Sequence, residues 1–204
     1  VLASQSLFGK INDSILSLAC VFELVHTYSL IHDDLPAMDN DDYRRGQPTN
    51  HIKFGEDIAI LAGDTLSTYS FEILSQELVK AYPADISLQS ISLFAKSLSL
   101  YGMAGGQVLD LKGFDSKSNL THLSKMHSLK TGALIKAALL IPAILNQSSA
   151  FVFQALETYG NHLGLLFQIV DDILDIIATK ESLGKTPGKD SKQHKLTYVS
   201  LLGL

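Results

Sequence analysis

Aspartate residues are concentrated in two short segments of the sequence. Five of the 21 acidic residues lie within ten positions, at Asp33, Asp34, Asp39, Asp41 and Asp42. Like charges about 5–7 Å apart repel by roughly 0.6–3 kcal/mol per pair, depending on the effective dielectric constant. A solvated helix end explains one such cluster on its own, but a second cluster favours bound cations that offset the repulsion.

The second cluster has the spacing of one helix face. Asp171 and Asp175 lie about 40° apart and one turn distant on a helix, with Asp172 beside them and Gln168 one turn earlier. We therefore expect their side-chain oxygens to converge. An apolar helical segment precedes each cluster, so we interpret the two clusters as facing halves of one site.

The first cluster contains a proline that interrupts its helix. Pro36 lies between Asp34 and Asp39, and a proline at this place lets the chain turn and bring Asp39 back toward Asp33 and Asp34. The ligands of both clusters are carboxylate oxygens, without cysteine or clustered histidine. This donor set favours magnesium over zinc.

Basic residues follow each acidic cluster. Arg44 and Arg45 come directly after the first, and Lys185, Lys189 and Lys195 come after the second. A phosphate group would explain why acidic and basic residues lie together. The aspartates would bind magnesium that bridges the phosphate oxygens, and arginine would form bidentate hydrogen bonds with the same phosphate. The sequence therefore predicts a phosphorylated substrate, and it contains no Gly-Lys-Ser/Thr loop of the nucleotide-hydrolysing type.

The elements that must position these residues are helical. Apolar residues recur at intervals of three and four in five segments, whereas strand patterns are weak throughout. The five segments are 12–35, 58–79, 88–109, 120–145 and 151–177. The connections between them are short, so we predict an all-α protein with one domain over residues 1–204. Gly105-Gly106 falls inside a helical pattern and predicts a close helix crossing.

Composition excludes several classes of partner. The net charge of −5 gives no positive field for nucleic acid. The longest apolar stretch, 133–145, has 13 residues, fewer than the roughly 20 that a membrane span needs. We see no secretion signal, and the single cysteine, Cys20, is expected to be a small core residue of a cytoplasmic protein.

Several motifs together resemble the trans-prenyltransferase (polyprenyl synthetase) family. They are Asp33-Asp34-Leu35-Pro36-Ala37-Met38-Asp39, Asp41-Asp42-Tyr43-Arg44-Arg45-Gly46, Gly63-Asp64, Lys130-Thr131-Gly132 and the segment from Phe167 to Asp175. The resemblance implies the all-α isoprenoid synthase bundle around a central cavity. It also implies magnesium-dependent, head-to-tail condensation of isopentenyl diphosphate with an allylic diphosphate. Within the family, the chain is most similar to the bacterial farnesyl diphosphate synthases.

The resemblance also implies roles for individual residues. Three magnesium ions would be held by Asp33, Asp34, Asp39, Asp171, Asp172 and Asp175. The allylic diphosphate would be contacted by Arg44, Lys130, Gln168, Lys185 and Lys195, while Thr131 helps to position the reacting carbons. Arg45 and His26 match positions that bind isopentenyl diphosphate. His26 lies seven residues before Asp33, hence on the same helix face, although a lone helical histidine is more often a core or interface residue.

Product length, by the same resemblance, is set on the helix before the first cluster. The bulky Tyr28 lies five positions before Asp33, and the small Ser29 lies one turn before it. With the two extra residues of the first aspartate motif, this is typical of the fifteen-carbon class, although Tyr28 as an ordinary core aromatic is the alternative. A geranylgeranyl diphosphate synthase and a non-catalytic subunit of a prenyl synthase also remain alternatives. A terpene cyclase is disfavoured, because the second motif keeps the Asp171-Asp172-Ile173-Leu174-Asp175 form.

The resemblance extends to assembly and to segments beyond the sequence. The family's basic residues upstream of Val1 and its C-terminal helices are absent, so we expect flanking segments at both ends of the catalytic domain. The family implies a homodimer.

Overall fold

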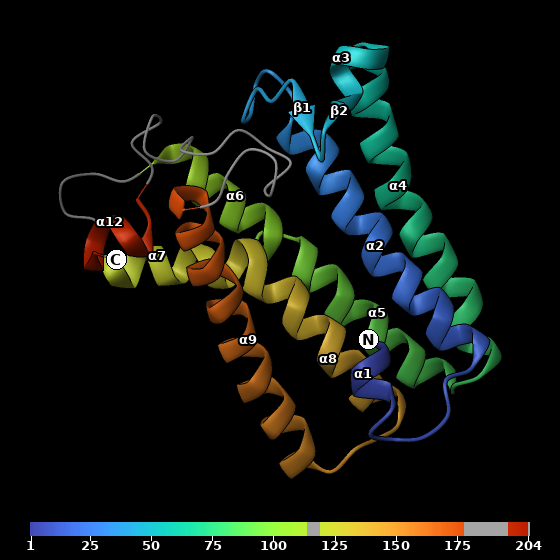
Figure 1. Ribbon diagram of the computed structural model, residues 1–204. Coiled ribbons are helices and arrows are strands. Elements are labelled where there is room, and N and C mark those ends of the chain that lie inside the picture. The colour runs from blue at the N-terminus through green and yellow to red at the C-terminus, as the bar shows by residue number, and fades with distance from the viewer. Residues whose placement is uncertain (114–118, 178–195, 204) are drawn as a thin grey trace. The chain divides into compact units, whose positions relative to one another are not determined.

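The computed structural model describes residues 1–113, 119–177 and 196–203 (Figure 1). Helices dominate these residues, and the only strands among them form a two-stranded hairpin. The structure divides into two compact units, residues 1–91 with 142–147 and residues 92–141 with 148–204. The prediction of an all-α protein is confirmed, and the number of domains stays a prediction.

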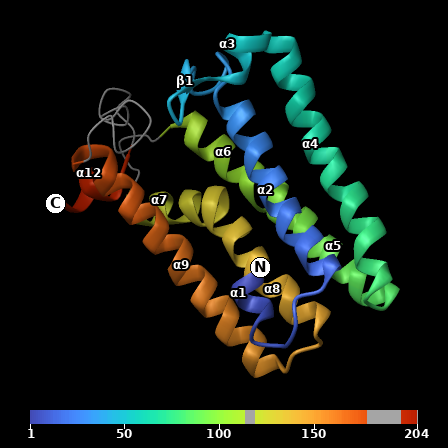
Figure 2. The ribbon, with the colours of Figure 1, turned by 45° about the vertical axis from the view of Figure 1, so that its right-hand side comes forward.

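Two long helices form the centre of the first unit. Helix α2 (Asp13–Asp33) packs along α4 (Glu56–Glu77), as Figures 1 and 2 show. Smaller elements complete the unit: α1 (Leu2–Gln5), β1 (Tyr43–Arg44), β2 (Gln47–Pro48), α3 (Asn50–Phe54), the 3₁₀ turn η1 (Leu78–Lys80) and the first half of α5 (Ala84–Leu98).

Helix α2 begins and ends for reasons that are local in the sequence. The Asn12 side chain accepts a hydrogen bond from the backbone N–H of Ile15 at 2.9 Å and caps the first turn. The helix ends at Asp33, before Pro36. Its buried apolar residues are Ile15, Leu18, Val21, Phe22 and Val25, spaced as one helix face.

Cys20 departs from its predicted place in the core, because it is exposed. It lies between Leu18 and Val21 in the sequence, and a helix rotates by about 100° per residue, so the buried stripe through these two residues excludes it. An apolar neighbourhood along the sequence was therefore a misleading guide to burial.

The second unit contains the remaining helices. After the second half of α5 come α6 (Met103–Lys112), α7 (Leu120–His127), the π-helical turn η2 (Ser128–Gly132), α8 (Ala133–Leu145), α9 (Ala150–Ile177) and α12 (Tyr198–Leu202). The end of α8, from residue 142, belongs to the first unit. Leu123 and Met126 of α7 form a buried cluster with Tyr198 of α12, and Ile169 of α9 packs against it.

Two of the predicted helical segments depart from a regular α-helix in the structure. The segment predicted over 88–109 breaks between α5 and α6, where a Cβ on Gly102 would overlap the carbonyl of Ser97. The segment predicted over 120–145 is continuous but widens into the π turn at 128–132. The break between α5 and α6 and the π turn both involve close backbone contacts between turns. The spacing of apolar residues does not indicate such contacts.

Two helical stretches, Asp13–Asp33 and Leu120–Leu145, are long and apolar enough to span a membrane by length and composition alone. Core helices of soluble proteins meet the same criterion, so this is weak support for a span. The second stretch exceeds the 13 apolar residues considered in the sequence because α7, η2 and α8 follow one another without a break.

Candidate active site

The chain turns back sharply after α2. The backbone N–H of Asp39 donates to the carbonyl of Asp33 at 2.8 Å, and that of Asp41 donates to the carbonyl of Asp34 at 3.1 Å. Asn40, between them, adopts a left-handed φ of 51°, which asparagine tolerates better than most residues. This turn brings the backbone of the first aspartate cluster together around the end of α2.

Asp34 and Arg44 form a bidentate ion pair within this turn, in which the Asp34 side chain is buried and that of Arg44 is partly exposed. The Arg44 Nε lies 2.9 Å from each carboxylate oxygen, and Nη2 lies 2.6 Å from Oδ1. Burial by itself lowers the pKa of Arg44, but the hydrogen bond and charge of Asp34, with the charges of Asp33 and Asp39, raise it above its usual value. A predicted metal ligand and a predicted diphosphate ligand are therefore already bound to each other.

The hairpin β1–β2 presents the second arginine. Tyr43 pairs with Pro48 and Arg44 with Gln47, so Arg45 and Gly46 form the two-residue turn, with φ values of 52° and 76°. The hydroxyl of Thr49 donates to the carbonyl of Asp41 at 2.7 Å and ties the hairpin to the aspartate turn. Arg45 is exposed at the tip of this hairpin.

His26 of α2 lies in the electrostatic field of both arginines. Desolvation lowers its pKa, and the charges of Arg45 and Arg44 lower it further against the opposing effect of Glu23. The hydroxyl of Ser29 donates to the carbonyl of His26 at 2.8 Å. The structure therefore groups His26 with Arg44 and Arg45 in the first unit.

Tyr28 contacts a histidine that the sequence analysis missed. Its ring meets the ring of His32 edge-on, with centroids 5.8 Å apart, and both side chains are half-buried. The Nε2 of His32 lies 3.1 Å from the carbonyl of Ile60 and 3.9 Å from a carboxylate oxygen of Asp64. A Cβ at Gly63 would overlap the His32 ring, so the Gly63-Asp64 motif makes room for this histidine.

In the second unit, Lys130 and Thr131 lie on the π turn η2. Such turns are rare and occur preferentially at functional sites. A Cβ at Gly106 of α6 would overlap the backbone of Lys130, which confirms the predicted close helix crossing, and a Cβ at Gly164 of α9 would lie 2.9 Å from the Cα of Gly132. The π turn is thus enclosed by glycines of two helices.

A chain of hydrogen bonds leads from Thr131 to the second aspartate cluster. The Thr131 hydroxyl donates to Gln168 Oε1 at 3.2 Å, Gln168 Nε2 donates to Asp172 Oδ1 at 3.1 Å, and the backbone N–H of Tyr198 donates to Asp172 Oδ2 at 2.7 Å. Desolvation raises the pKa of Asp172, as do the charges of Asp171 and Asp175, while its hydrogen bonds act in the opposite direction. Asp172 therefore joins α9 to the start of α12.

Two residues near Lys130 were missed by the sequence analysis. Lys130 Nζ donates to Asp110 Oδ2 at 2.6 Å, and their side chains are 24% and 11% exposed. The buried ring of His127 lies in the field of Asp110, Lys130 and Asp171, and burial lowers its pKa to about 4. The available sequence signal was the position of Asp110 one helical turn after Gly106.

The predicted metal ligands offer carboxylate oxygens alone, the donors that magnesium prefers. Among residues 1–113, 119–177 and 196–203, no group of three or more His, Cys, Asp or Glu side chains could hold a metal ion by itself. Magnesium commonly completes its coordination with waters and substrate phosphate, so the donor set fits this ion. The predicted diphosphate ligands Lys185 and Lys195 lie outside the described residues.

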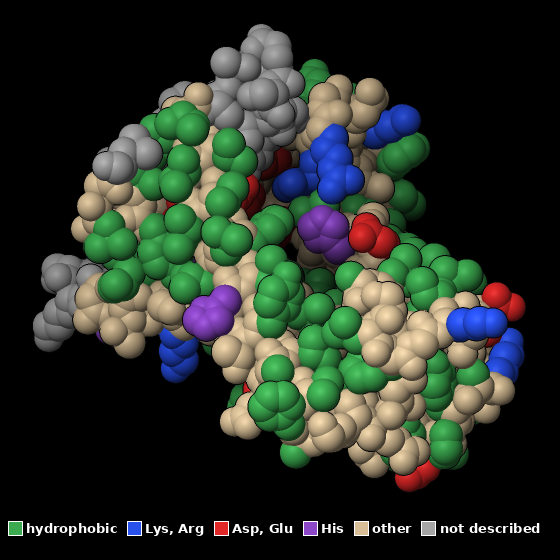
Figure 3. Space-filling view, turned by 60° about the horizontal axis from the view of Figure 1, so that its bottom comes forward, with side chains coloured by type: hydrophobic (Ala, Val, Ile, Leu, Met, Phe, Trp, Pro, Cys, Tyr) green, Lys and Arg blue, Asp and Glu red, His purple; other side chains and the backbone are tan. Residues whose placement is uncertain are grey.

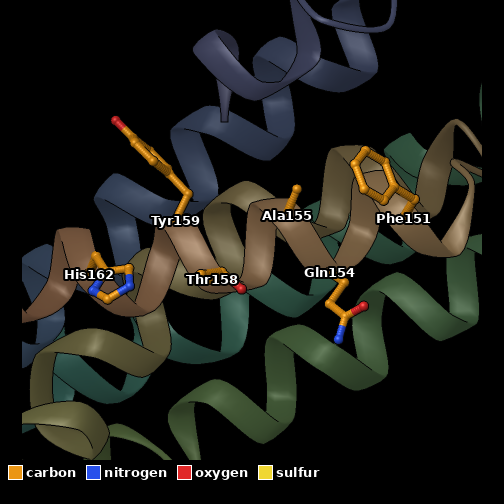
Figure 4. Close-up of a pocket in the computed structure, with 6 residues that line it drawn as sticks. All are labelled: Phe151, Gln154, Ala155, Thr158, Tyr159 and His162. Carbon is orange, nitrogen blue, oxygen red and sulfur yellow. The ribbon is translucent and has the colours of Figure 1, made fainter.

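A shallow groove of about 540 Å³ lies elsewhere, along α9 (Figure 4). Its six lining residues all come from this helix: Phe151, Gln154, Ala155, Thr158, Tyr159 and His162. None of them is a predicted site residue. The predicted central cavity and the shared metal site stay predictions.

Solved structures define the class of protein to which this fold belongs. The chain is similar to a geranyltransferase of Helicobacter pylori, solved with magnesium and isoprenyl diphosphate (TM-score 0.84, 40% identity, 94% of this chain and 62% of that one). It is also similar to an FPP/GFPP synthase of Zymomonas mobilis (TM-score 0.85, 37% identity, 99% and 67%). The fold is the all-α isoprenoid synthase fold.

Sequence comparison identifies the family. The polyprenyl synthetase profile matches residues 1–204, and the chain belongs to this family. Across its full length it is 50% identical to a dimethylallyltranstransferase of Fischerella ambigua and 49% identical to a geranylgeranyl diphosphate synthase of Cyanophora paradoxa. Over 93% of its length it is 44% identical to a farnesyl diphosphate synthase of Geobacillus stearothermophilus. It spans 59%, 68% and 64% of these relatives' lengths.

Proposed function

We propose that the full-length protein is a trans-prenyltransferase. It joins isopentenyl diphosphate to dimethylallyl or geranyl diphosphate, head to tail, and releases diphosphate. The observation that carries this proposal is the set of basic and acidic groups that each unit assembles: the aspartate turn with Arg44 and Arg45, and the π turn with Lys130 beside Asp110. Family membership supports the same reaction.

The two aspartate motifs hold the metal in this proposal. Asp33, Asp34 and Asp39 of the first motif, and Asp171 with Asp172 and Asp175 of the second, supply oxygens for magnesium. Magnesium, when bound, neutralises the leaving diphosphate so that the allylic carbon–oxygen bond can ionise. Three ions per site is the number that the family resemblance implies.

The basic residues bind and orient the two diphosphates. Arg44, Lys130 and Gln168, with Lys185 and Lys195, contact the allylic diphosphate, because charged donors stabilise the negative charge that develops as it leaves. Thr131, held by Gln168 at 3.2 Å, lies on the same turn as Lys130 and helps to place the reacting carbons. Arg45 and His26 bind isopentenyl diphosphate, and their grouping in the first unit supports a common role.

Carbon–carbon bond formation then needs little further chemistry from the chain. The isopentenyl double bond attacks the allylic carbon, and the proton lost when the new alkene forms passes to the departing diphosphate. An apolar cavity would protect the allylic cation from water.

We propose farnesyl diphosphate as the product. The half-buried Tyr28 packs against His32. In this proposal its ring blocks further growth of the prenyl chain beyond fifteen carbons. Relatives named as farnesyl and as geranylgeranyl diphosphate synthases match the chain comparably well, so geranylgeranyl diphosphate is the second candidate product.

We further propose a cytoplasmic homodimer. Apolar side chains are spread over the molecular surface that Figure 3 shows, and Ile60, Leu61 and Tyr69 of α4 are among the exposed ones. Large exposed apolar areas are typical of protein–protein interfaces, and they support association of two copies.

One experiment tests the reaction and its product. The full-length protein is incubated with radiolabelled isopentenyl diphosphate and each of the dimethylallyl, geranyl and farnesyl diphosphates, with magnesium or with a chelator. We expect a magnesium-dependent fifteen-carbon product from dimethylallyl and geranyl diphosphates. We expect no product from farnesyl diphosphate. A twenty-carbon product would favour the geranylgeranyl alternative, and no product under any condition would contradict the proposed activity.

A further inference from the structure

Helix α6 contacts Lys130 at both ends of the lysine. At Gly106, the backbone of α6 lies so close to the Lys130 backbone that no Cβ fits between them. One turn later on the same helix face, Asp110 accepts a hydrogen bond from the Lys130 ammonium at 2.6 Å. A single helix therefore fixes both the backbone and the charged end of this residue.

The side chains of Asp110 and Lys130 are largely shielded from solvent. Asp110 is 11% and Lys130 24% exposed at their side chains, so solvent screens the pair less than it screens a surface pair. A buried pair adds little net stability, but loss of one partner leaves a charge without compensation. An ammonium carries three N–H donors, and Asp110 accepts the hydrogen bond of one of them.

His127 lies in the electrostatic field of both Asp110 and Lys130. Its ring is 7% exposed, and its Nδ1 has no hydrogen-bond partner among the described residues. Because burial keeps this ring neutral at neutral pH, it adds no positive charge near the Lys130 ammonium. On the far side of the π turn, the hydroxyl of Thr131 is bound to Gln168 instead, so the two neighbouring side chains are held by different helices.

We propose that Asp110 is a positioning residue, which holds the Lys130 ammonium in the orientation that receives the diphosphate. The proposal rests on the proposed function, because it takes Lys130 as a diphosphate ligand. Asp110 acts through Lys130 and does not itself contact substrate. Its isosteric amide, in Asp110→Asn, keeps the shape of the side chain but removes the charge that directs the ammonium.

A double-mutant cycle on the full-length protein tests this proposal. The affinity for inorganic diphosphate in the presence of magnesium is measured by calorimetry for the wild type, Asp110→Asn, Lys130→Met and the double variant. The ratio kcat/KM is measured for the same four proteins. We expect Asp110→Asn to lower kcat/KM by about 10–100-fold. We also expect it to weaken the binding of diphosphate. Both effects are expected to shrink to less than about twofold when Lys130 is already Met.

Two further variants separate positioning from charge and from folding. Asp110→Glu keeps the charge but displaces it by one methylene, so we expect it to recover only part of the lost rate. A matched cycle uses the loose ion pair of Lys136 and Glu157, which lie 3.9 Å apart in the same unit. Lys136→Met and Glu157→Gln are expected to show no coupling in either measurement. Thermal unfolding of all variants reports any folding defect separately.

Several results would overturn the proposal. Equal fold-losses from Asp110→Asn in the two Lys130 backgrounds would show that the carboxylate acts independently of the lysine. Full activity in Asp110→Glu would show that Asp110 contributes only its negative charge and does not position the lysine. Because diphosphate affinity is measured without turnover, a wild-type protein that lacks prenyltransferase activity would contradict the proposed function while leaving the Asp110–Lys130 coupling to be read directly.

Discussion

The carboxylate of Asp34 and the guanidinium of Arg44 are joined by three hydrogen-bond contacts of 2.6–2.9 Å, and the Asp34 side chain is only 4% exposed. The first aspartate turn therefore carries its own counter-charge. When magnesium and a diphosphate bind as proposed, they must share or replace this pair.

Removing the arginine should destabilise the first unit more than removing both partners. Arg44→Gln leaves Asp34 buried without its cation, so the free energy of unfolding should fall by about 2–3 kcal/mol. Asp34→Asn in the same protein should restore most of the loss, because the buried charge is gone. Urea unfolding in the presence of a chelator measures both variants and the wild type. Equal stability of Arg44→Gln and the wild type would show that the pair contributes nothing to folding.

Adding a methyl group at Gly63 should displace His32. The new Cβ overlaps the imidazole, so Gly63→Ala should lower the free energy of unfolding by about 1–3 kcal/mol. His32→Ala in the Gly63→Ala background should recover part of that loss by opening the space. Thermal unfolding compares the single and double variants, and no recovery in the double variant would remove His32 as the cause.

Shortening Tyr28 should lengthen the product. Tyr28→Ala deletes the ring that meets His32 and enlarges the space beside α2, so we expect a shift from fifteen-carbon toward longer prenyl diphosphates. Products are sized by chromatography after dephosphorylation. Tyr101→Ala removes an exposed tyrosine and serves as the control with an unchanged product. An unchanged spectrum in Tyr28→Ala would separate product length from this residue.

Stability should depend on pH through His127. Its pKa is about 4 in the folded protein, against about 6.5 in an unfolded chain. The unfolded state therefore binds the proton first as pH falls, so this group lowers folding stability progressively from about pH 6.5 to about pH 4. The groups that act on it are Asp110, Lys130 and Asp171.

His127→Gln should flatten that part of the stability profile. The difference between wild type and variant should change by on the order of 2–3 kcal/mol across the window, measured by urea unfolding with a chelator present. Parallel profiles of the two proteins between pH 4 and 6.5 would mean that His127 titrates normally in the folded state.

Local sequence features predicted much of the helical framework. Apolar periodicity indicated the helices that became α2, α4 and α9, since a buried helix face must repeat at about 3.6 residues. The predicted interruption at Pro36 matches the end of α2 at Asp33, because proline restricts the residue before it and removes a backbone donor. The predicted close crossing at Gly105-Gly106 holds for the same kind of reason, since Gly106 has no side chain to separate two backbones.

Periodicity was a poor guide wherever contacts between turns or elements decided the outcome. It predicted one helix over 88–109, but the close approach of Gly102 to Ser97 divides α5 from α6. It did not indicate the π turn at Lys130, which is packed between Gly106 and Gly164. The apolar neighbours of Cys20 in the sequence predicted a core position, although the buried stripe of α2 runs on another side.

The sequence by itself determined the chemistry that is available: two carboxylate motifs, the basic residues that accompany them, and helices that repeat apolar residues toward a core. Those properties are local, because residue type sets charge and near-neighbour spacing sets helix face. Only the tertiary structure decided which groups are bound to each other. Asp34 holds Arg44, Asp110 holds Lys130 and Gly63 admits His32 because segments 10 to about 30 residues apart are packed together, and packing at that range is fixed by the shape of whole helices, which no short motif encodes.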